Sequence, residues 1–539
     1  MSIKISTTII ILGFLNSGCD NHNPVAARIK TLMVPENVNN RDVSINAGNA
    51  YNNRFLDSIV LRKFITQEKL NDTLADALRS FYNARNFEYA WFSSDGLIEQ
   101  SLSFRSLYKT DDQTDLVNSS LEGRLDRDRI DKESTVKANE AATIKTELQL
   151  SLQFIRYGLV HFKDMGIGTS SLGTFIPAKK KDILELSDEV LADDNTSNKN
   201  YAAFNKSYGL LKTKLQQYSA IAKNGGWPKL SMNANQYRRG RSNQDIVQLK
   251  SRLRSTGELS TNDTSENADQ NLQNALKSYQ QNHGYAASGK VTTSLLKDLN
   301  LSVLARIQQI LINMQRMRWM PDRSKGVYIK VNIPEYVVYV DSGKTTLFKM
   351  DVVVGAEGHN TTMFSGNINQ IVFSPYWNIP SSIANKEVIP GLRRDRNYLK
   401  KRNMERVGSS GFRQKPGPRN ALGKVKFLFP NSFNIYMHDT PQKGYFDRAK
   451  RGLSHGCIRL SDARKLAIYL LLEYPEWTVE RIDSAMNSGH ELFVNLKTTV
   501  PVIITYYTAW VDEKEFLHFA DDLYQHDQTM AQKMFNNPQ

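Results

Sequence analysis

Hydrophobic residues in the first half of the chain recur three and four positions apart, the spacing of one buried face of an α-helix. Ala141–Phe162 and Ala202–Ala222 show this pattern most clearly. Polar segments at Asp111–Lys137 and Asp193–Asn200 interrupt it, and we expect them to be loops. The pattern therefore predicts an α-helical domain over residues 51–235.

A shorter helical unit follows at residues 242–300. Gly257 and Asn282-His283-Gly284 supply helix ends, and a polar loop, Ser260–Asp269, separates the helices. Its two apolar stripes comprise Ile246, Leu249 and Leu253, then Leu272, Ala275, Leu276 and Tyr279. We expect a small module of helices, with residues 301–326 as a connecting helix.

The pattern changes at Val327, where short apolar or β-branched runs alternate with turn residues, as in β-strands. Two helices are expected later, one capped by Ser461 and running to Leu471, and one over Trp477–Asn487. The predicted strands are Val327–Ile333, Tyr336–Val340, Thr345–Val354, Ile368–Phe373, Val425–Phe429, Phe433–His438 and Pro501–Ala509. The fold class is thus multidomain α+β, with a mainly β domain over 327–512 and a C-terminal tail over 513–539.

The N-terminus predicts export. Lys4 precedes an apolar stretch, Thr7–Leu15. This stretch is shorter than the roughly 20 residues that span a bilayer and suits a secretory signal over residues 1–19. Its end, Gly18-Cys19, resembles the lipobox of bacterial lipoproteins, although Asn16 replaces the usual Leu. The resemblance implies a lipid on Cys19, and a signal without lipid is the alternative. Residues 20–50, polar and rich in Asn, are expected to be a tether.

Composition narrows the possible partners. A chain of 539 residues is too long for one core, so two to four domains are expected. The net charge of +15 suits an anionic partner such as nucleic acid, an acidic membrane surface or a wall polymer. Export excludes nucleic acid and leaves the membrane and the wall.

Cys457 is the only cysteine besides Cys19. An unpaired thiol in an exported protein is either a nucleophile or a buried structural residue. Its neighbours favour the nucleophile, because His438 and His455 lie within nineteen residues of it and can supply a base. Gly456 allows close backbone approach, and the N–H groups around it can stabilise an oxyanion. This chemistry requires no metal or other cofactor.

The segment from His438 to Ser454-His455-Gly456-Cys457 resembles the signature of the L,D-transpeptidase catalytic domain. The resemblance extends to Val353-Val354-Gly355, to Pro375–Pro380 and to Asn420–Phe427. Residues 242–300 resemble a peptidoglycan-binding module, although a helical spacer that binds nothing is the alternative. Large family members join a helical scaffold, this module and the catalytic domain in the same order. One departure is Thr361-Thr362-Met363-Phe364, where Thr-Pro-x-Phe is usual.

The resemblance implies a role for each residue of the motif. Cys457 is the nucleophile, His438 is the general base, and the main-chain carbonyl of Asp439 orients His438. His455 and Gly456 shape the oxyanion site. Residues expected to contact substrate are Arg459, Tyr436, Trp377, Asn378 and Ser454, and for Arg459 a pairing with the protein's own acidic residues is equally open.

Residues 381–419, rich in Arg, Lys and Gly, correspond to a capping loop over the active site. Arg393, Arg394, Arg396 and Arg413 lie within it and are expected either to attract stem-peptide carboxylates or to be a solvated surface. The position of this segment before the catalytic motif matches that of the capping loop in large family members.

The implied reaction is a 3→3 cross-link in peptidoglycan, formed through a Cys457 thioester with loss of the terminal D-Ala of a tetrapeptide donor. Water as acceptor would make an L,D-carboxypeptidase or endopeptidase, and a protein acceptor an anchoring transferase. An inactive wall-binding lipoprotein is the alternative from another class. The family is acylated by carbapenems and acts in the periplasm or cell envelope. Its implied partners are peptidoglycan, a membrane through the lipid, and wall-synthesis proteins through the scaffold.

Overall fold

A computed structural model describes residues 38–109, 118–130, 140–162, 169–192, 205–260, 262–319, 326–343 and 345–539. These residues belong to the unit Glu36–Gln539. The predicted signal segment 1–19 and its Cys19 lie outside the described residues. In the described part of the chain, no helix has both the length and the apolar character needed to cross a bilayer.

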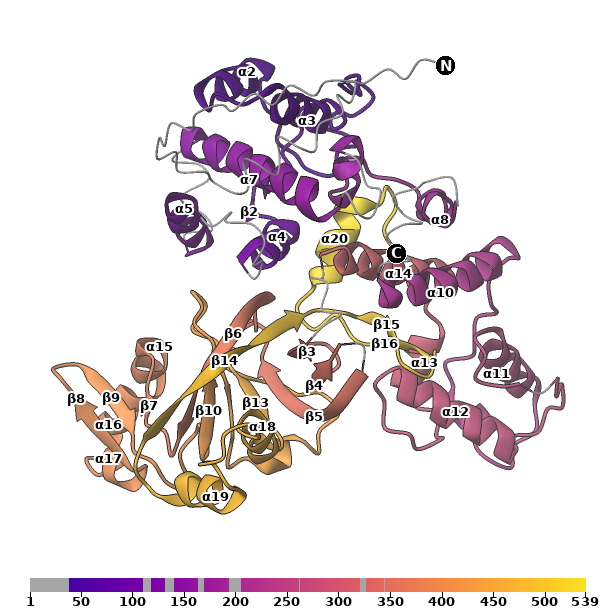
Figure 1. Ribbon diagram of the computed structural model, residues 1–539. Helices are drawn as coiled ribbons and strands as arrows, with labels where there is room; N and C mark the ends of the chain where they lie inside the picture. Colours follow the sequence, from indigo (N-terminus) through magenta and orange to yellow (C-terminus); the bar gives the residue numbers. More distant parts are fainter. Residues whose placement is uncertain are drawn as a thin grey trace, which may run out of the picture. The chain divides into compact units, whose positions relative to one another are not determined.

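The helical region follows the predicted periodicity (Figure 1). In α3, Leu74, Leu78 and Phe81 are buried at helical spacing, and Asn71 caps the helix by accepting from the Leu74 N–H. The elements are α2 (Ser58–Gln67), α3 (Asp72–Asn83), β1 (Phe92–Ser93), β2 (Gly96–Leu97), α4 (Glu99–Lys109), α5 (Ser119–Ile130), α7 (Glu140–His161), η1 (Thr169–Phe175), α8 (Ile183–Leu191) and α10 (Lys206–Lys223).

Two segments of this region differ from the prediction. The expected loop Asp111–Lys137 contains helix α5, which Arg105 of α4 holds through ion pairs to Glu122 at 2.6 Å and Asp126 at 2.8 Å. The loop prediction was wrong for these residues because charge pairing stabilises a helix whose apolar face is short. The described end of the expected tether is also packed on the helices, with Ile45 only 2% exposed.

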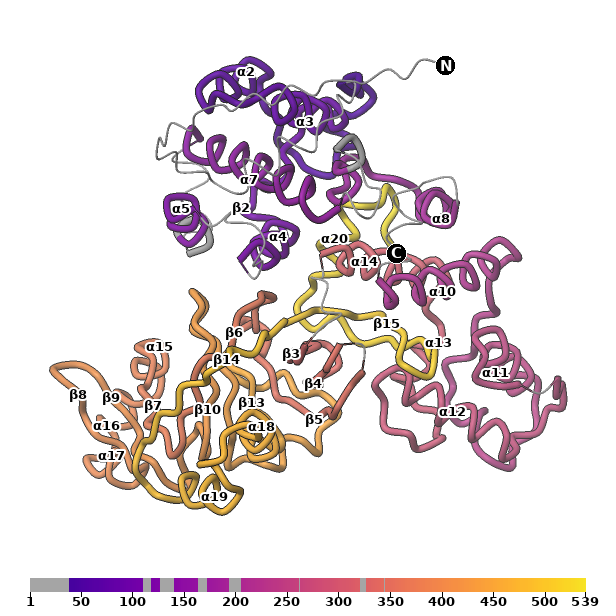
Figure 2. Tube along the Cα trace, in the orientation of Figure 1, coloured from indigo at the N-terminus to yellow at the C-terminus, as the bar shows by residue number. Residues whose placement is uncertain are grey.

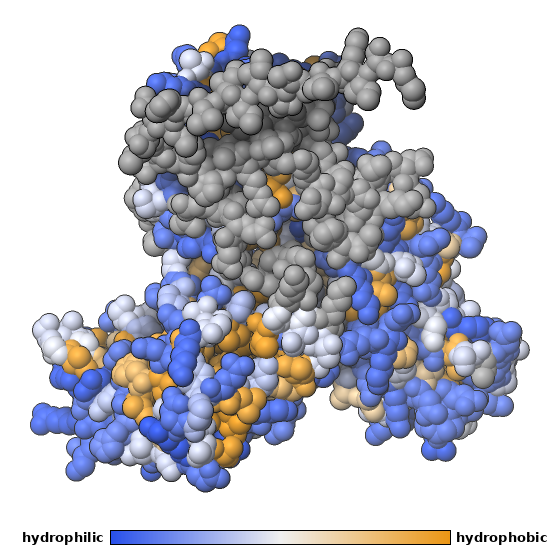
Figure 3. Space-filling view, viewed as in Figure 1, coloured by the Kyte–Doolittle hydropathy of each residue, from blue (hydrophilic) through white to orange (hydrophobic). Residues whose placement is uncertain are grey.

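The small module has its own apolar core, built by the two predicted stripes. Its elements are η2 (Ala234–Tyr237), α11 (Gln244–Ser255), α12 (Gln270–Asn282) and α13 (Thr293–Leu299). The buried ammonium of Lys250 anchors the polar loop by pairing with Asp263 and contacting Ser265 Oγ at 3.0 Å. The polar loop is therefore part of the module's fold. Most of the module's surface that is visible in Figure 3 is hydrophilic.

The C-terminal half is a nine-stranded sheet in the order β12-β5-β13-β11-β10-β6-β14-β3-β4, and β4 also pairs with β5 to close it. Alternate residues face the interior, such as Ile329 and Val331 in β3. The strands are β3 (Val327–Asn332), β4 (Val337–Ser342), β5 (Thr345–Gly355), β6 (Phe364–Phe373), β10 (Val425–Leu428), β11 (Met437–His438), β12 (Gly452–Ser454), β13 (Ile458–Leu460) and β14 (Leu492–Thr505).

Helices α18 (Ala463–Leu470) and α19 (Val479–Asn487) pack on this sheet, and η4 (Lys443–Tyr445) follows β11. The first of these helices is capped by Asp462, whose side chain accepts from the Lys465 N–H, rather than by Ser461. The predicted fold class is confirmed: helical elements come first, then a small helical module, then a mainly β region with a few helices.

The expected capping segment forms a substructure with a small apolar core around Val388 and Phe412. A three-stranded sheet, β7 (Trp377–Asn378), β9 (Gly411–Gln414) and β8 (Met404–Val407), lies beside α15 (Ser381–Ile383), the π-helix η3 (Ala384–Val388), α16 (Ile389–Arg394) and α17 (Tyr398–Lys401). The segment therefore folds as an insertion of its own between β6 and β10.

Residues 513–539, expected as a tail, are ordered parts of the fold. They contribute β16 (Leu517–Phe519), which pairs with β15 (Ala509–Val511), and α20 (His526–Met534). Figure 2 traces α20 to the side of α14 (Val303–Met317), and Met530, Met534 and Phe535 enter the same apolar core as α3 and α7. Apolar side chains late in the chain therefore complete the helical core.

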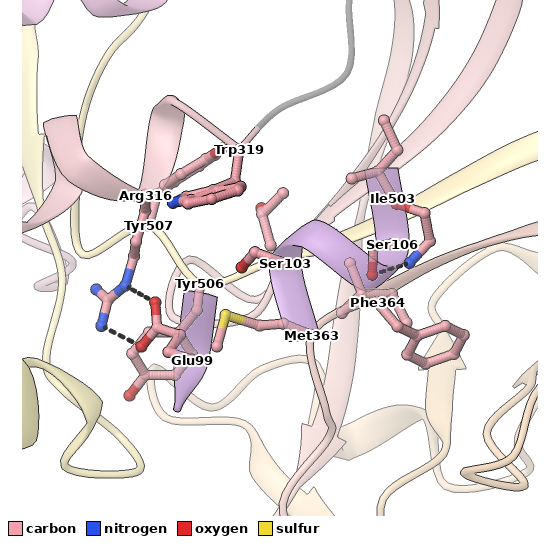
Figure 4. Close-up of a pocket in the computed structure, with 13 residues that line it drawn as sticks. Glu99, Ser103, Ser106, Arg316, Trp319, Met363, Phe364, Ile503, Tyr506 and Tyr507 are labelled. Carbon is pink, nitrogen blue, oxygen red and sulfur yellow. Dashed lines mark hydrogen bonds and ion pairs between the residues drawn. The ribbon is translucent and has the colours of Figure 1, made fainter. Parts of the chain in front are cut away.

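A buried ion-pair triad holds these elements together. Arg316 of α14 donates from Nε to Glu99 of α4 at 2.7 Å and also pairs with Asp527 of α20. Figure 4 shows Glu99 and Arg316 side by side at a cavity of about 40 Å³ between α4, α14 and the strands β6 and β14. The cation thus joins three elements that are far apart in sequence.

Candidate active site

The parallel pair β11 and β13 brings the predicted catalytic residues together. Met437 lies opposite Ile458 and His438 opposite Arg459. Met437 and Ile458 face the interior, so the alternating side chains of His438 and Arg459 lie on the other face. Cys457 directly precedes β13, and the Ile458 N–H donates to the Tyr436 carbonyl at 3.1 Å. Tyr436, His438, Cys457 and Arg459 therefore share one face of the sheet.

The side chain of Cys457 is half-buried. Burial raises its pKa, and hydrogen bonding to Tyr436 and the positive charge of Arg459 offset only part of this rise. Its Sγ lies 3.7 Å from the Asn434 carbonyl oxygen. The resting side chain is therefore a neutral thiol at neutral pH, and a base must remove its proton before it can attack.

His438 is suited to be that base. It is buried, and burial together with the charge of Arg459 lowers its pKa to about 4, so the ring is neutral at physiological pH. Its Nδ1 lies 2.5 Å from the main-chain carbonyl oxygen of Asp439. Because a carbonyl only accepts, Nδ1 carries the proton and Nε2 keeps the free lone pair.

The Asp439 side chain, unlike its main-chain carbonyl, binds residues of the neighbouring turns. Its Oδ2 accepts from the Lys424 N–H at 2.9 Å, and its Oδ1 pairs with Lys443 at 2.8 Å. A Cβ at Gly423, where φ is +63°, would lie 2.4 Å from Oδ2. The carboxylate thus holds the turns around the strand, while the main-chain carbonyl of Asp439 faces His438.

The turn before the nucleophile is held by Ser454. Its buried hydroxyl accepts from the Gly456 N–H at 3.1 Å and donates to the Cys457 carbonyl at 2.6 Å. This placement makes Ser454 a support of the turn. Gly456 has φ of +112°, which favours glycine. Within the described residues, the Cys457 N–H has no acceptor, so it is the amide left for an oxyanion.

Arg459 is oriented without a carboxylate. It donates to Gln442 Oε1 at 2.8 Å, its guanidinium lies 5.6 Å from the centre of the Tyr445 ring, and its buried Nε has no hydrogen-bond partner. No acidic residue in the described ranges pairs with it.

His455 lies at the surface next to the nucleophile. Its ring is 5.1 Å from the ring of His359, and its Nε2 is 4.0 Å from Glu387 of the capping segment. Burial and the neighbouring His359 lower its pKa. No hydrogen bond in the described part of the chain fixes its ring, which suits a residue that shapes the site better than a base.

Trp377 and Asn378 lie at the start of the insertion between β6 and β10. They form β7 and pair with Gln414 and Arg413 of β9, and Trp377 packs against the apolar cluster of the capping segment. Over residues 381–419 there are eleven Lys and Arg against three Asp and Glu. Arg413 is paired with Glu405 at 2.6 Å.

The sequence did not point to Asn434, Gln442 or Tyr524. Asn434 has φ of +55°, and this left-handed residue presents its carbonyl to Cys457. A larger cavity, of about 280 Å³, lies between α4, β6 and the loop Pro430–Phe433. Asn is common in turns, and this was the available signal for Asn434. Gln442 and Tyr524 could be identified only from the folded structure. Among the described residues, no cluster of three His, Cys, Asp or Glu side chains could hold a metal ion.

Parts of the chain are similar to known protein families and to a curated protein. A family model of the L,D-transpeptidase catalytic domain matches residues 326–504, a scaffold-domain model matches 76–215, and a "Putative peptidoglycan binding domain" matches 242–299. A Haemophilus influenzae protein named "Putative L,D-transpeptidase" is 30% identical over 234 residues, which span 40% of this chain and 47% of that protein. The chain thus spans about half the length of this curated relative.

Solved structures with similarity include two L,D-transpeptidases. The protein from Stackebrandtia nassauensis is 13% identical with a TM-score of 0.22, covering 50% of this chain and 94% of its own. The protein from Mycobacterium smegmatis is 15% identical with a TM-score of 0.20, covering 33% of this chain and 58% of its own. Scores this low carry no argument about this chain.

Proposed function

We propose that this chain, which carries an L,D-transpeptidase catalytic domain and a peptidoglycan-binding domain, forms 3→3 cross-links in peptidoglycan through a thioester on Cys457. The observation that carries the proposal is the placement of a neutral, oriented His438 on the same face as Cys457. The two domain matches support peptidoglycan as the substrate and a location outside the cytoplasm. Residues 1–19 are proposed as its signal and Cys19 as its lipid anchor.

The first step breaks one amide bond and forms one thioester. His438 Nε2 removes the Cys457 proton as the sulfur attacks the carbonyl carbon of the third stem residue. The negative charge that develops on the carbonyl oxygen is stabilised by the Cys457 N–H. When the carbon–nitrogen bond breaks, His438 returns the proton to the leaving amine, and D-alanine departs.

In the second step, an amine is the attacking group and the Cys457 sulfur is the leaving group. The side-chain amine of a neighbouring stem's third residue attacks the thioester carbon, His438 takes a proton from that amine, and the sulfur leaves as thiolate. The thiolate recovers the proton from His438, so the enzyme returns to its neutral resting pair. The unpaired Nε of Arg459 and its position beside Cys457 support a contact with a stem-peptide carboxylate.

The test is intact-protein mass spectrometry of the full chain incubated with a disaccharide-tetrapeptide, beside Cys457→Ala. The proposal predicts a thioester adduct on Cys457 and a 3→3 dimer from the wild type alone. A carbapenem is expected to acylate the same residue. Release of D-alanine without dimer would assign water as acceptor and a carboxypeptidase activity. Absence of adduct with both substrate and carbapenem would refute the enzyme and favour the wall-binding scaffold.

A further inference from the structure

The peptide bond between Gly456 and Cys457 is held from one side only. Its carbonyl oxygen accepts from Thr361 Oγ1 at 2.8 Å, while its N–H, that of Cys457, is unbonded among the described residues. A trans peptide is planar, and its C=O and N–H point in opposite directions. A bond that fixes the carbonyl therefore also fixes the direction of the amide that the proposed oxyanion needs.

The hydroxyl of Thr361 has a single proton, and its neighbours decide where that proton goes. The Gly355 N–H donates to Oγ1 at 2.9 Å, so the oxygen is the acceptor in that bond. The hydroxyl proton is left for the Gly456 carbonyl. Thr361 is 1% exposed, so water does not compete for either bond.

Tyr524 fixes Thr361 in turn. Its hydroxyl accepts from the Thr361 N–H at 3.2 Å and donates to the Gly355 carbonyl at 2.7 Å. Tyr524 is buried and stacks on Tyr506, whose hydroxyl accepts from the Tyr524 N–H at 2.7 Å. One phenol thus joins the two residues, Gly355 and Thr361, that start and end the loop behind Gly456.

The loop has little freedom to adjust. A Cβ at Gly355 would lie 2.0 Å from the His359 carbonyl oxygen and 2.8 Å from the Thr361 nitrogen, so the loop closes directly on this glycine. The carbonyls of His359 and Asn360 lie under Gly456, 3.7 and 3.8 Å from where its Cβ would be. A change at Tyr524 therefore reaches the turn of the nucleophile through packed backbone rather than through solvent.

We propose that Tyr524 is a positioning residue for the acyl-transfer site, acting through Thr361 to orient the Gly456 carbonyl and with it the Cys457 N–H. The inference rests on the proposed function. Tyr524 lies beyond residues 326–504, the part that matches the catalytic domain, so this chain completes its site with a residue from its own C-terminal segment.

The experiment measures acylation of the full chain by a carbapenem, followed by intact mass as a function of probe concentration. Tyr524→Phe keeps the ring and loses both hydrogen bonds, so we expect the maximal acylation rate to fall about tenfold. The half-saturating concentration should stay within about twofold of the wild-type value, since the lost interaction serves the transition state. Thr361→Val should show at least the same loss, and Thr361→Ser should recover most of the rate.

Tyr474→Phe is the matched control. Its phenol is also buried and accepts a backbone N–H, that of Lys497, but has no described contact with the loop, so its acylation rate should equal that of the wild type. The double variant Tyr524→Phe/Thr361→Val should be no slower than Thr361→Val alone, because the two residues act in series.

Normal acylation of Tyr524→Phe, or a change only in the half-saturating concentration, would overturn the inference while leaving the proposed function intact. An equal loss in Tyr474→Phe would also overturn it, because any buried phenol would then suffice. Failure of the wild type itself to form an adduct would instead remove the proposed function. If Tyr524→Phe fails to fold, the comparison of Thr361→Val with Thr361→Ser still tests whether the hydroxyl that Tyr524 positions sets the acylation rate.

Discussion

Protonation of His438 gives the sharpest test of the site. Burial and the nearby charge of Arg459 lower its pKa to about 4, whereas an ordinary histidine has a pKa of about 6.5. If His438 takes the thiol proton, acylation requires its neutral form. Activity should therefore persist well below the pH at which an unperturbed histidine would become charged.

The difference is large at pH 5.5. With a pKa of about 4, roughly 97% of His438 is neutral there, but with a pKa of about 6.5 only roughly 10% would be. The acylation rate at pH 5.5 should therefore be close to its value at pH 7.5 instead of tenfold lower. Because Arg459 lowers the pKa of His438, Arg459→Gln should move the acid limb to higher pH.

The assay is the pH dependence of the second-order acylation rate, which reports the free enzyme, with folding checked by circular dichroism at each pH. His455→Gln serves as control: it changes the rate only through the shape of the site, so the midpoint of its acid limb should match the wild type. A wild-type midpoint near 6.5 would refute the role of burial. An acid limb that moves to lower pH in Arg459→Gln would refute the role of that charge.

Three further predictions concern the fold that supports the site. Arg316→Met leaves Glu99 and Asp527 buried without their cation, so denaturant titration should show a loss of about 3–5 kcal/mol, and an unchanged midpoint would contradict the triad. Burial raises the pKa of Glu88 to about 8, above its ordinary value of 4.5, so its contribution to stability is full below pH 4.5 and lost as the pH rises through about 8. Thermal melts at pH 5 and pH 8 should show this decline in the wild type and a flatter profile in Glu88→Gln, and identical profiles would count against it. Gly355→Ala should lower the free energy of unfolding by about 1–3 kcal/mol and slow acylation, and a variant with wild-type acylation would show that the loop adapts.

Much of the architecture could be predicted from the sequence because buried residues recur at the period of the helix or strand to which they belong. The strands from Val327 to Phe373 and the helices α7 and α10 lie close to where alternation and helical spacing predicted them. Cys457 and His438 were accessible for a different reason, because a lone thiol close to histidines is chemically unusual. The structure places His438 on β11 and Cys457 directly before the neighbouring strand β13, and their catalytic roles are proposals.

The missed features are those that depend on contacts distant in sequence. The strand expected at Phe433–His438 begins only at Met437, because Asn434 adopts a left-handed backbone that periodicity does not register. Helix α20 shows little apolar stripe, and its burial comes from helices hundreds of residues earlier. Tyr524 is one of 23 tyrosines, and only the fold distinguishes it from the others.

The shared helical core has a consequence for how the protein is made. Residues near Leu61 and residues near Phe535 pack in one apolar cluster. The helices synthesised first therefore cannot complete their core until the last helix has been synthesised. During translation, the early helices expose apolar surface until the whole β region has followed. The protein should therefore depend on holding chaperones while it folds, and nascent chains that stop early should be cleared by proteolysis.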